Sequence, residues 1–568
     1  MTSTEVGGAR ARSGNPSTAV RLRTLGASAA TTFDHWSAQV SMRLELLRLR
    51  LLPGRWLRQG QGDASDLDDA AFLRRPAILG FVALMMVALG ASLPSSPFKL
   101  EMPGAWFFGM PSTPGATDQG LFVGLVAVYG GLVLFMRVWY RLTKALAVRP
   151  GVPVKYLAMM FALWVIPMLV VPPLFSQDVY SYAAQGEMVS HHISPYVYGP
   201  FVLGGSPYVS GVNALWGNTP APYGPFFLII DGALASLSMH NVLVTVVLLR
   251  LLSLLGVILI AWSIPQLARL YGRDPSAIFS LAVLNPLVLL SLVASAHNDA
   301  LMLGVMLCGL TFAKRGRPVV GVLICAVAAA IKAPAELAVL YIGWEWLGTG
   351  IPWRQRVRPV VTALLISAAV MVAFTAISGL GFGWVANLET PGTVRSWLAP
   401  ATGIGMLLSW IAHLLHLGIS QGAVLSVTRV IGLLSAAVAG VYLLLNADRL
   451  GTLRSLGYTL LLFVALGPVV QPWYLSWGLI ILAVVATGWT RRLIVVLSVL
   501  SPFIGLTGGR QLLDQLIHSD LLVVAVALMA LLAVLVAPLG PWSRSAVPED
   551  EARGGSDWTP GRPPLAGI

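Results

Sequence analysis

Apolar segments recur along almost the whole chain and are separated by short polar or basic stretches. Roughly 17 to 25 apolar residues are enough to cross a bilayer, and shorter segments need distortion or shielding by neighbouring helices. The pattern therefore predicts an all-α polytopic membrane protein with about fourteen transmembrane segments. The predicted segments lie near residues 76–93, 121–136, 156–175, 242–264, 277–296, 300–313, 319–331, 335–347, 360–380, 423–445, 456–470, 474–487, 493–506 and 521–535.

The two ends of the chain differ from its middle. Residues 1–75 begin with Gly, Ala, Ser and Arg and contain no early apolar core, so we expect no cleavable signal peptide. Residues 37–58 fit a basic amphipathic helix on the inner leaflet, or equally a linker with some helical propensity. Residues 541–568 are polar and rich in Gly and Pro, which predicts disorder. We expect a cytoplasmic N-terminal region (1–75), a polytopic domain (76–540) and a cytoplasmic tail (541–568).

Composition narrows the class of protein further. Hydrophobic residues make up 56% of the 568 residues and charged residues only 11%, against roughly 25% charged residues in an ordinary globular domain. A cytosolic enzyme, a disordered scaffold and a disulfide-stapled secreted domain are therefore excluded. The two cysteines, Cys308 and Cys325, lie in apolar runs without a metal-ligand spacing, so we expect packed thiols.

The formal net charge of +13 raises the question of nucleic-acid binding, and the positions of the basic residues answer it. All but six of the 37 Lys and Arg residues lie in the N-terminal region, the tail or every second loop. If the N-terminus is cytoplasmic, these loops face the cytoplasm, as the positive-inside rule requires. We therefore expect both termini in the cytoplasm and no nucleic-acid partner. The six exceptions are Lys99, Arg250, Lys332, Arg395, Arg429 and Arg510.

Acidic residues are few on the predicted outer side, and Asp178 is the most prominent of them. A helix that continues beyond Phe175 would place Asp178, Tyr182 and Gln185 on one face. A carboxylate, a phenol and an amide would then share the outer membrane boundary. A helix-terminal acid that satisfies backbone amides explains Asp178 equally well, so both interpretations stay open.

The long outer loop that follows carries histidine and aromatic residues. His191 and His192 are adjacent, but no carboxylate follows them at helical ligand spacing, so we interpret them as loop surface and predict no metal site. The Pro, Tyr and Gly residues at 220–225 predict a rigid turn, and the Tyr223 ring could also stack on a sugar.

Two further polar turns are predicted at the outer ends of apolar segments. One contains His297, Asn298 and Asp299; three hydrogen-bonding side chains exceed what a tight turn needs, but Asn and Asp as turn formers explain the pattern equally well, so both interpretations stay open. The other holds Lys332 between two apolar segments that are too short to cross a bilayer comfortably. Half-length helices that meet at a charged residue commonly build a site in membrane proteins. We therefore favour an anion site at Lys332, with an ion pair to Glu336 as the alternative.

The last outer-side features lie in two later loops. Arg395 lies in a loop that also carries Trp and Glu, and Gln471, Trp473, Tyr474 and Trp477 surround the tip of another hairpin. Aromatic residues at the ends of membrane segments usually form interfacial belts, and we expect this of Trp477. The other three residues of the hairpin could equally line a sugar pocket.

Six motifs occur along the chain in the order FSQDVYSYAAQGEM, ISPYVYGP, TPAPYGPFF, VLNPLVLLSLVASAHNDALMLG, AVAAAIKAP and QPWYLSW. Together they resemble the actinobacterial polyprenol-phosphomannose-dependent α-1,6-mannosyltransferases of lipomannan synthesis, the MptA/MptB type, from about Pro76 to Leu535. The resemblance implies the GT-C glycosyltransferase fold, with outer-side loops that form the active site. It also implies inverting transfer of mannose from polyprenyl-phosphate mannose to an α-1,6-mannan acceptor on the outer face of the plasma membrane. The implied acceptor is a mannosylated phosphatidylinositol or lipomannan, in lipomannan and lipoarabinomannan biosynthesis.

The resemblance also implies roles for the outer-side residues. The base that takes the acceptor proton is implied at Asp178, and positive charge near the departing phosphate is implied at Lys332, Arg395 and His297. Residues implied to bind the sugar or the acceptor are Tyr182, Gln185, Tyr223, Asn298, Asp299, Gln471, Trp473 and Tyr474. Asp299 stands where close relatives often carry Glu, so a role that depends on side-chain length is in doubt. No cofactor is predicted, and a divalent cation is left open, because one outer carboxylate without a close second is a weak metal site.

Two other functions stay open on the residues alone. Lys332, Arg250, Arg429 and Asp231 lie in apolar surroundings and could mark the path of a transporter or lipid flippase. A transporter usually has two matching halves with interrupted helices, and the sequence contains no clear repeat of this kind. A GT-C transferase for another polyprenyl-phosphate sugar, such as arabinose, is disfavoured only by the resemblance. The sequence also does not separate initiation of the mannan backbone from its elongation.

Overall fold

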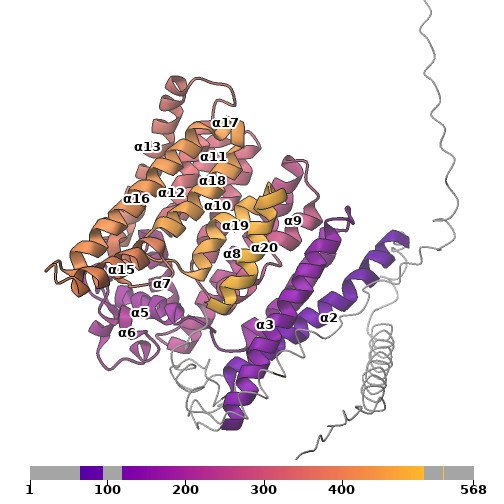
Figure 1. Ribbon diagram of the computed structural model, residues 1–568, viewed down its shortest axis with the longest axis horizontal. Coiled ribbons are helices and arrows are strands. Elements are labelled where there is room, and N and C mark those ends of the chain that lie inside the picture. The colour runs from indigo at the N-terminus through magenta and orange to yellow at the C-terminus, as the bar shows by residue number, and fades with distance from the viewer. Residues whose placement is uncertain (1–63, 94–117, 505–528, 530–568) are drawn as a thin grey trace, which may run out of the picture. The chain divides into compact units, whose positions relative to one another are not determined.

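The computed structural model describes residues 64–93, 118–504 and 529 (Figure 1). The chain divides into two units, Met1–Leu67 and Asp68–Ile568, and the helices below belong almost wholly to the second. All regular structure in the described residues is helical, as the apolar pattern predicts. The predicted N-terminal amphipathic helix and the C-terminal tail lie outside the described residues, as does almost all of the last predicted transmembrane segment.

Within the described residues, five helices are long and apolar enough to cross a membrane. They are α2 (Ala64–Ser92), α3 (Asp118–Leu146), α8 (Val242–Leu270), α13 (Trp353–Ser378) and α16 (Gln421–Leu445). A sixth candidate is the pair of η3 (Val288–Ala294) and α10 (Asp299–Lys314), which is bent by 113°. These helices support a protein that associates with membranes, while the count of about fourteen spans stays a prediction.

Shorter helices lie between the long ones. They are α4 (Val154–Val170), α5 (Asp178–Ser190), α6 (Ala214–Gly217), α7 (Pro225–Leu237), α9 (Pro275–Ala282), α11 (Pro318–Ala329), α12 (Glu336–Glu345), α14 (Gly383–Ala386), α15 (Pro400–Leu414), α17 (Ala447–Leu450), α18 (Thr452–Leu466), α19 (Leu475–Val484) and α20 (Gly488–Ile504). The 3₁₀ turns are η1 (Pro200–Leu203), η2 (Pro207–Val209), η4 (Ala333–Ala335), η5 (Asn387–Thr393) and η6 (Pro472–Tyr474). Several of these helices begin with proline, because the first turn of a helix does not use the N–H that proline lacks.

The predicted segment at 277–296 is wrong as a single helix. The chain forms α9, leaves the helical path around Asn285, and continues as the π-helix η3. Pro286 has no backbone N–H with which to continue α9, and Asn285 Oδ1 accepts the N–H of Leu287 at 2.9 Å. A left-handed residue, Ala296 (φ 57°), then turns the chain into α10. The polar turn before α10 therefore lies at a break between two helices.

Helix α10 packs between α8 and α11 through small residues. A Cβ atom on Gly304 of α10 would lie 2.2 Å from the carbonyl oxygen of Gly256 on α8. A Cβ atom on Gly309 would lie 2.5 Å from Cys325 Sγ on α11. Small residues that let helix backbones approach are typical of helix pairs in membranes. Cys325 is buried and Cys308 is partly buried, in agreement with packed thiols.

The loops that carry many of the basic residues meet at one end of the described helices, which we call the basic end. The contacts join Arg149 with Asp68 and Asp69, Gly151 N–H with Asp274 (2.8 Å), Lys314 with Glu345 (2.6 Å), Arg356 with Asp448 (2.6 Å) and Arg491 with the Thr143 carbonyl (2.9 Å). In Figure 1 the α17 label lies toward this end and the α5 and α6 labels lie toward the other. The membrane face that the basic end occupies stays a prediction.

Two arginines that the transporter interpretation invoked are bound to the backbone. Arg250 is buried and donates to the carbonyls of Val171 and Ala294, the latter at 3.1 Å. Arg429 donates to the Val394 carbonyl (2.7 Å) and to Thr402 Oγ1 (3.0 Å). Carbonyl groups at the end of a helix need such donors, because no further helical turn supplies an N–H to hydrogen-bond with them. Both arginines therefore have a structural explanation in the positions of these segments.

Candidate active site

A cavity of about 640 Å³ lies at the end of the helices opposite the basic end. Its wall consists largely of helix ends and turns: the start of α5, the 213–223 loop, the turn before α12, the 388–398 segment and the turn between α18 and α19. Apolar side chains of α16 and α18 complete the wall. We call this end of the helices, opposite the basic end, the cavity end.

Asp178 is the first residue of α5, a new helix that begins after the non-helical residues 171–177, so Asp178, Tyr182 and Gln185 do lie on one helix. Among the described residues, no backbone N–H donates to the Asp178 carboxylate; its own backbone N–H donates to Ser176 Oγ (3.2 Å). Asp178, Ser181 and Gln185 line the cavity. Within the described part of the chain, Ser181 Oγ and Gln185 Oε1 are buried and have no hydrogen-bond partner; the hydroxyl can donate or accept a hydrogen bond, and the amide oxygen can accept one.

Tyr182 lies behind the wall rather than on it. Its ring is buried and packs edge-to-face on Tyr223 (5.2 Å between centroids) and on Phe227 (5.3 Å). Burial raises the pKa of the Tyr223 phenol well above its usual range, so Tyr223 stays neutral at physiological pH. Tyr223 itself lines the cavity. The prediction placed Asp178, Tyr182 and Gln185 on one helix face. Only Asp178 and Gln185 line the cavity.

His297 is fully buried next to Asp178. Its Nε2 lies 3.5 Å from Asp178 Oδ2 and 3.1 Å from Ser176 Oγ, while its Nδ1 lies 2.6 Å from the Ser291 carbonyl oxygen. A carbonyl oxygen can only accept, so the network assigns a proton to Nδ1 and directs Nε2 toward Ser176 and Asp178. The ring stacks on Trp473 with centroids 3.8 Å apart.

Lys332 lies in the turn between α11 and α12, as the two short apolar segments predict. Its Nζ donates to Asp299 Oδ2 (2.8 Å) and Asn298 Oδ1 (3.3 Å). The alternative ion pair with Glu336 is wrong in this structure, because Glu336 accepts from Ser367 Oγ at 2.7 Å. The polar turn before α10 and the lysine turn thus meet directly.

Aromatic rings surround the Lys332 ammonium. It lies 4.9 Å from the Tyr474 ring, 5.6 Å from the Trp477 ring and 5.8 Å from the Tyr223 ring. The Trp477 indole N–H donates to Asp299 Oδ1 (2.6 Å), and Trp477 is only 4% exposed. The expectation of an interfacial belt is therefore wrong for Trp477, which positions the carboxylate that holds Lys332.

Gly224 explains how Tyr223 reaches Lys332. The Gly224 N–H donates to the Ile331 carbonyl (3.1 Å), and a Cβ atom at this position would lie 2.2 Å from the Ala330 carbonyl oxygen. The rigid turn at 220–225 can therefore lie directly against the end of α11 only with glycine at its last position before α7.

The remaining predicted site residues lie on the cavity wall, behind it or away from it. Gln471, Trp473 and Tyr474 line the cavity, whereas Asn298 and Asp299 are buried just behind Lys332. Arg395 is not brought to the cavity wall: its guanidinium donates to Gln421 Oε1 (3.0 Å) at an exposed position. Ser176 and Trp477 belong to the site although the sequence analysis did not assign them to it.

An all-helical membrane protein with a polar, aromatic cavity at the ends of its helices is the class that fold and site define. Residues 77–348 match the N-terminal domain of the α-(1→6)-mannopyranosyltransferases, and residues 401–537 match the MptB C-terminal domain. The chain belongs to this family, as its six motifs indicate.

Its similarity to individual members extends over most of the chain. A probable α-(1→6)-mannopyranosyltransferase of Mycolicibacterium smegmatis is 34% identical over 88% of this chain and 95% of the relative. An α-(1→6)-mannopyranosyltransferase of Mycobacterium tuberculosis is 32% identical over 85% of this chain and 91% of the relative. The α-(1→6)-mannopyranosyltransferase B of Corynebacterium glutamicum is 30% identical over 77% of each chain. No solved structure matches the chain.

Proposed function

We propose that the protein transfers mannose from polyprenyl-phosphate mannose to an α-1,6-mannan acceptor, with inversion, in lipomannan and lipoarabinomannan biosynthesis. The names of its relatives, α-(1→6)-mannopyranosyltransferases, support mannose as the sugar and α-1,6 as the linkage. The observation that carries the proposal is the cavity with Asp178 on one part of its wall and Lys332 on another. A carboxylate and an ammonium on one wall suit a reaction that needs a base and a group that stabilises a leaving phosphate.

The reaction is a single displacement. The acceptor hydroxyl oxygen bonds to the anomeric carbon while the bond from that carbon to the phosphate oxygen breaks, and the β-linked donor gives an α-linked product. The hydroxyl proton passes to Asp178, and polyprenyl phosphate departs with the bonding electrons. His297 Nε2 faces the Asp178 carboxylate at 3.5 Å and, with its own proton on Nδ1, can accept the proton that Asp178 takes from the acceptor hydroxyl.

Lys332 is the group that stabilises the departing phosphate in this proposal. Its present partner, Asp299, is fixed by Trp477 and lies behind the wall, so the ammonium is held at the cavity surface. The aromatic rings around it exclude water, and an ionic contact is stronger in such surroundings than in water. Leu433, Phe463 and Val464 on the same wall offer an apolar path for the polyprenyl chain.

The proposed topology places this chemistry outside the cell. If the basic end faces the cytoplasm, as the positive-inside rule requires, the cavity end faces the outer side of the plasma membrane. We propose a multi-pass GT-C protein with about fourteen spans and both termini in the cytoplasm. The acceptor is then a mannosylated phosphatidylinositol or lipomannan in the outer leaflet.

The experiment is a transfer assay with the purified protein in detergent. Polyprenyl-phosphate mannose and a short α-1,6-mannoside are the substrates, and linkage analysis identifies the product. We expect a product longer by one α-1,6-linked mannose. Transfer of arabinose but not mannose from the corresponding polyprenyl phosphates would replace the sugar in the proposal. No transfer from either donor, by folded protein, would contradict the proposed enzyme.

A further inference from the structure

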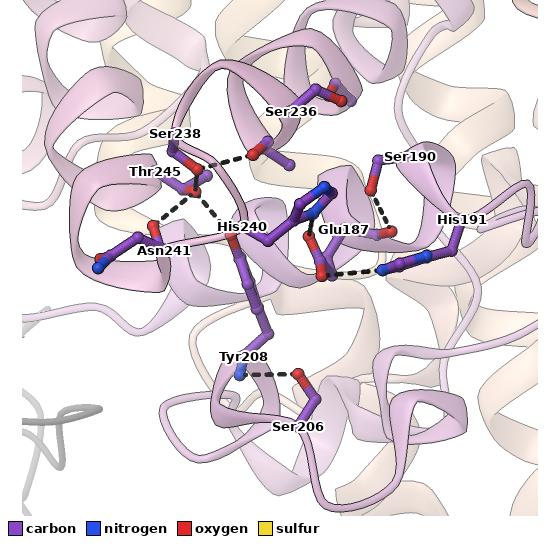
Figure 2. A network of polar contacts seen from close by, with 12 residues as sticks. Glu187, Ser190, His191, Ser206, Tyr208, Ser236, Ser238, His240, Asn241 and Thr245 are labelled. Atoms are coloured by element: carbon purple, nitrogen blue, oxygen red, sulfur yellow. Dashed lines mark hydrogen bonds and ion pairs between the residues drawn. The ribbon is translucent and has the colours of Figure 1, made fainter.

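A second polar cluster lies at the opposite end of α5 from Asp178 (Figure 2). Glu187, in the last turns of α5, has a side chain that is 7% exposed. His191 Nε2 lies 3.1 Å from one of its carboxylate oxygens, and His240 Nδ1 lies 2.9 Å from the other. Nine residues of helix, about 13 Å, separate Glu187 from Asp178, and none of the three cluster residues lines the cavity.

The donor atoms of the cluster are close to the arrangement that a metal ion requires. One donor atom from each residue can be chosen so that all lie within 4.8 Å of one another. Neighbouring ligands of a tetrahedral zinc ion with bonds of about 2.0–2.1 Å lie ~3.3 Å apart. Each carboxylate–imidazole distance is close to this spacing, but the two distances run to different oxygens of Glu187, so the side chains must turn slightly for all three residues to reach one ion. His191 and His240 are 55% and 47% exposed, which leaves their rings room to turn.

The donor set of the cluster suits a divalent cation. The Glu187 carboxylate lies against two imidazole rings, which stack with centroids 5.3 Å apart. One divalent ion bound by the two imidazole nitrogens and the carboxylate would use one donor atom from each of the three residues.

The turn that carries His240 is held in place by hydrogen bonds of its own (Figure 2). Thr245 Oγ1 lies 2.7 Å from Ser238 Oγ and 2.8 Å from the Tyr208 hydroxyl. Asn241 Oδ1 accepts two N–H groups in the first turn of α8, at 3.1 and 3.2 Å. His240 itself has a left-handed backbone (φ 59°), which the surrounding turn fixes. These bonds fix the backbone of the turn, and with it the position from which the His240 side chain reaches Glu187.

We propose that Glu187, His191 and His240 bind a divalent transition-metal ion, with Zn²⁺ as the ion that two imidazoles and one carboxylate suit. Three protein ligands leave one coordination position to solvent. The ion joins the end of α5 to the turn between α7 and α8, and so fixes the helix whose first residue is Asp178. The proposal does not depend on the transfer reaction. The prediction of no metal site at His191 and His192 rested on the absence of a carboxylate after them in the sequence. Glu187 instead precedes His191 by four residues.

The test is zinc binding by the full-length protein, purified in detergent without a polyhistidine tag and freed of metal with a chelator. Bound zinc is counted by mass spectrometry after removal of free ions, and Co²⁺ absorption reports the geometry. We expect one tightly bound zinc per chain for the wild type and for His192→Gln, the matched control, whose histidine is adjacent and exposed. Glu187→Gln, His191→Gln and His240→Gln should each lose more affinity than the roughly 10- to 100-fold caused by loss of an outer partner.

Thermal unfolding gives a second readout that is independent of mannose transfer. Zinc should raise the Tm of the wild type and of His192→Gln, but not that of His191→Gln. His191→Gln carries the test even if His240→Gln fails to fold, because the His191 side chain is more than half exposed. The proposal is overturned if the wild type retains no zinc at micromolar concentrations. It is equally overturned if folded His191→Gln retains as much zinc as His192→Gln.

Discussion

Helix α10 carries a charge pair at each of its ends, and the two pairs lie in different surroundings. At the basic end its last residue, Lys314, pairs with Glu345 (2.6 Å), and the two side chains are 14% and 29% exposed. At the cavity end its first residue, Asp299, pairs with Lys332 (2.8 Å) and is fully buried. Both charges of α10 have the sign that favours its helix dipole, so sign and distance do not distinguish the two pairs.

The neighbours of each pair make the difference. Lys314 has both oxygens of one carboxylate and the Tyr271 ring nearby. Lys332 has one carboxylate oxygen, one amide oxygen, three aromatic rings and a cavity beside it. The pair at the basic end therefore connects the ends of two helices, α10 and α12, whereas the pair at the cavity end holds an ammonium on a cavity wall. Charge pairs in such a chain indicate a site only together with the space around them.

The largest effect should come from Asp178, the proposed base at the cavity end. Asp178→Asn removes proton acceptance while preserving the shape of the side chain, so transfer should fall by roughly 10²- to 10⁴-fold. Asp68→Asn is the matched control, because Asp68 is an exposed partner of Arg149 at the basic end. Initial rates with polyprenyl-phosphate mannose measure both. Normal turnover by Asp178→Asn, with an unchanged Tm, would remove Asp178 from the proposed role.

The two lysines of the charge pairs should differ in stability and in donor binding. Lys332→Met leaves a buried carboxylate without its cation, which typically costs about 3–5 kcal/mol. Lys314→Met leaves a partly exposed Glu345, and we expect a loss of about 1 kcal/mol or less. Unfolding of both variants measures the difference.

A double variant separates stability from function at the cavity end. Lys332→Met with Asp299→Asn removes both charges, so it should regain part of the lost stability but not the donor affinity. Equal losses for the two single lysine variants, or normal donor affinity in the double variant, would contradict the distinction between the ends.

His297→Asn should have a smaller effect on catalysis. Asn can still donate to the Ser291 carbonyl but offers no basic nitrogen to Asp178, so kcat should fall on the order of tenfold to a hundredfold while the donor KM changes little. Steady-state kinetics separate the two parameters. A higher donor KM with an unchanged kcat would instead favour the phosphate contact that the resemblance implies for His297.

A change in the turn beside Lys332 should lower stability without removing any proposed catalytic group. Gly224→Ala places a Cβ atom 2.2 Å from the Ala330 carbonyl oxygen, and such overpacking costs about 1–3 kcal/mol. Gly205→Ala is the control, because a Cβ atom there meets nothing within 4 Å. Thermal unfolding compares the two. Equal stability would show that the turn can move away from α11 at no cost.

Much of the cavity end could be predicted because charged residues are rare in this chain. Asp178 and Lys332 stand out among apolar neighbours, and the structure places both on one cavity wall. Their partners were harder to predict. Glu336 is four residues from Lys332, which favours pairing within a helix, but the chain is not helical at Lys332 and its ammonium reaches Asp299 instead.

The site residues that could not be predicted from the sequence belong to types with common structural roles. Ser176 is an ordinary serine in the sequence, and only the fold brings its hydroxyl to His297. Trp477 follows the pattern of interfacial tryptophans, yet helix α19 is buried along its length and turns the indole toward Asp299. The break at Asn285 and Pro286 had a signal in the sequence, the proline itself, which the long apolar run around it obscured.

The cavity wall consists mainly of turns and helix ends, whereas close contacts such as that between Gly256 and Gly304 lie within the helices. If the cavity binds the substrates, as we propose, substrate preference and helix packing depend on largely separate sets of residues. Relatives can diverge in the sugar or acceptor they accept by exchanging short loops, without rebuilding the membrane helices. The 213–223 loop is thus a natural unit for transplantation between members of the family when an enzyme of altered specificity is wanted.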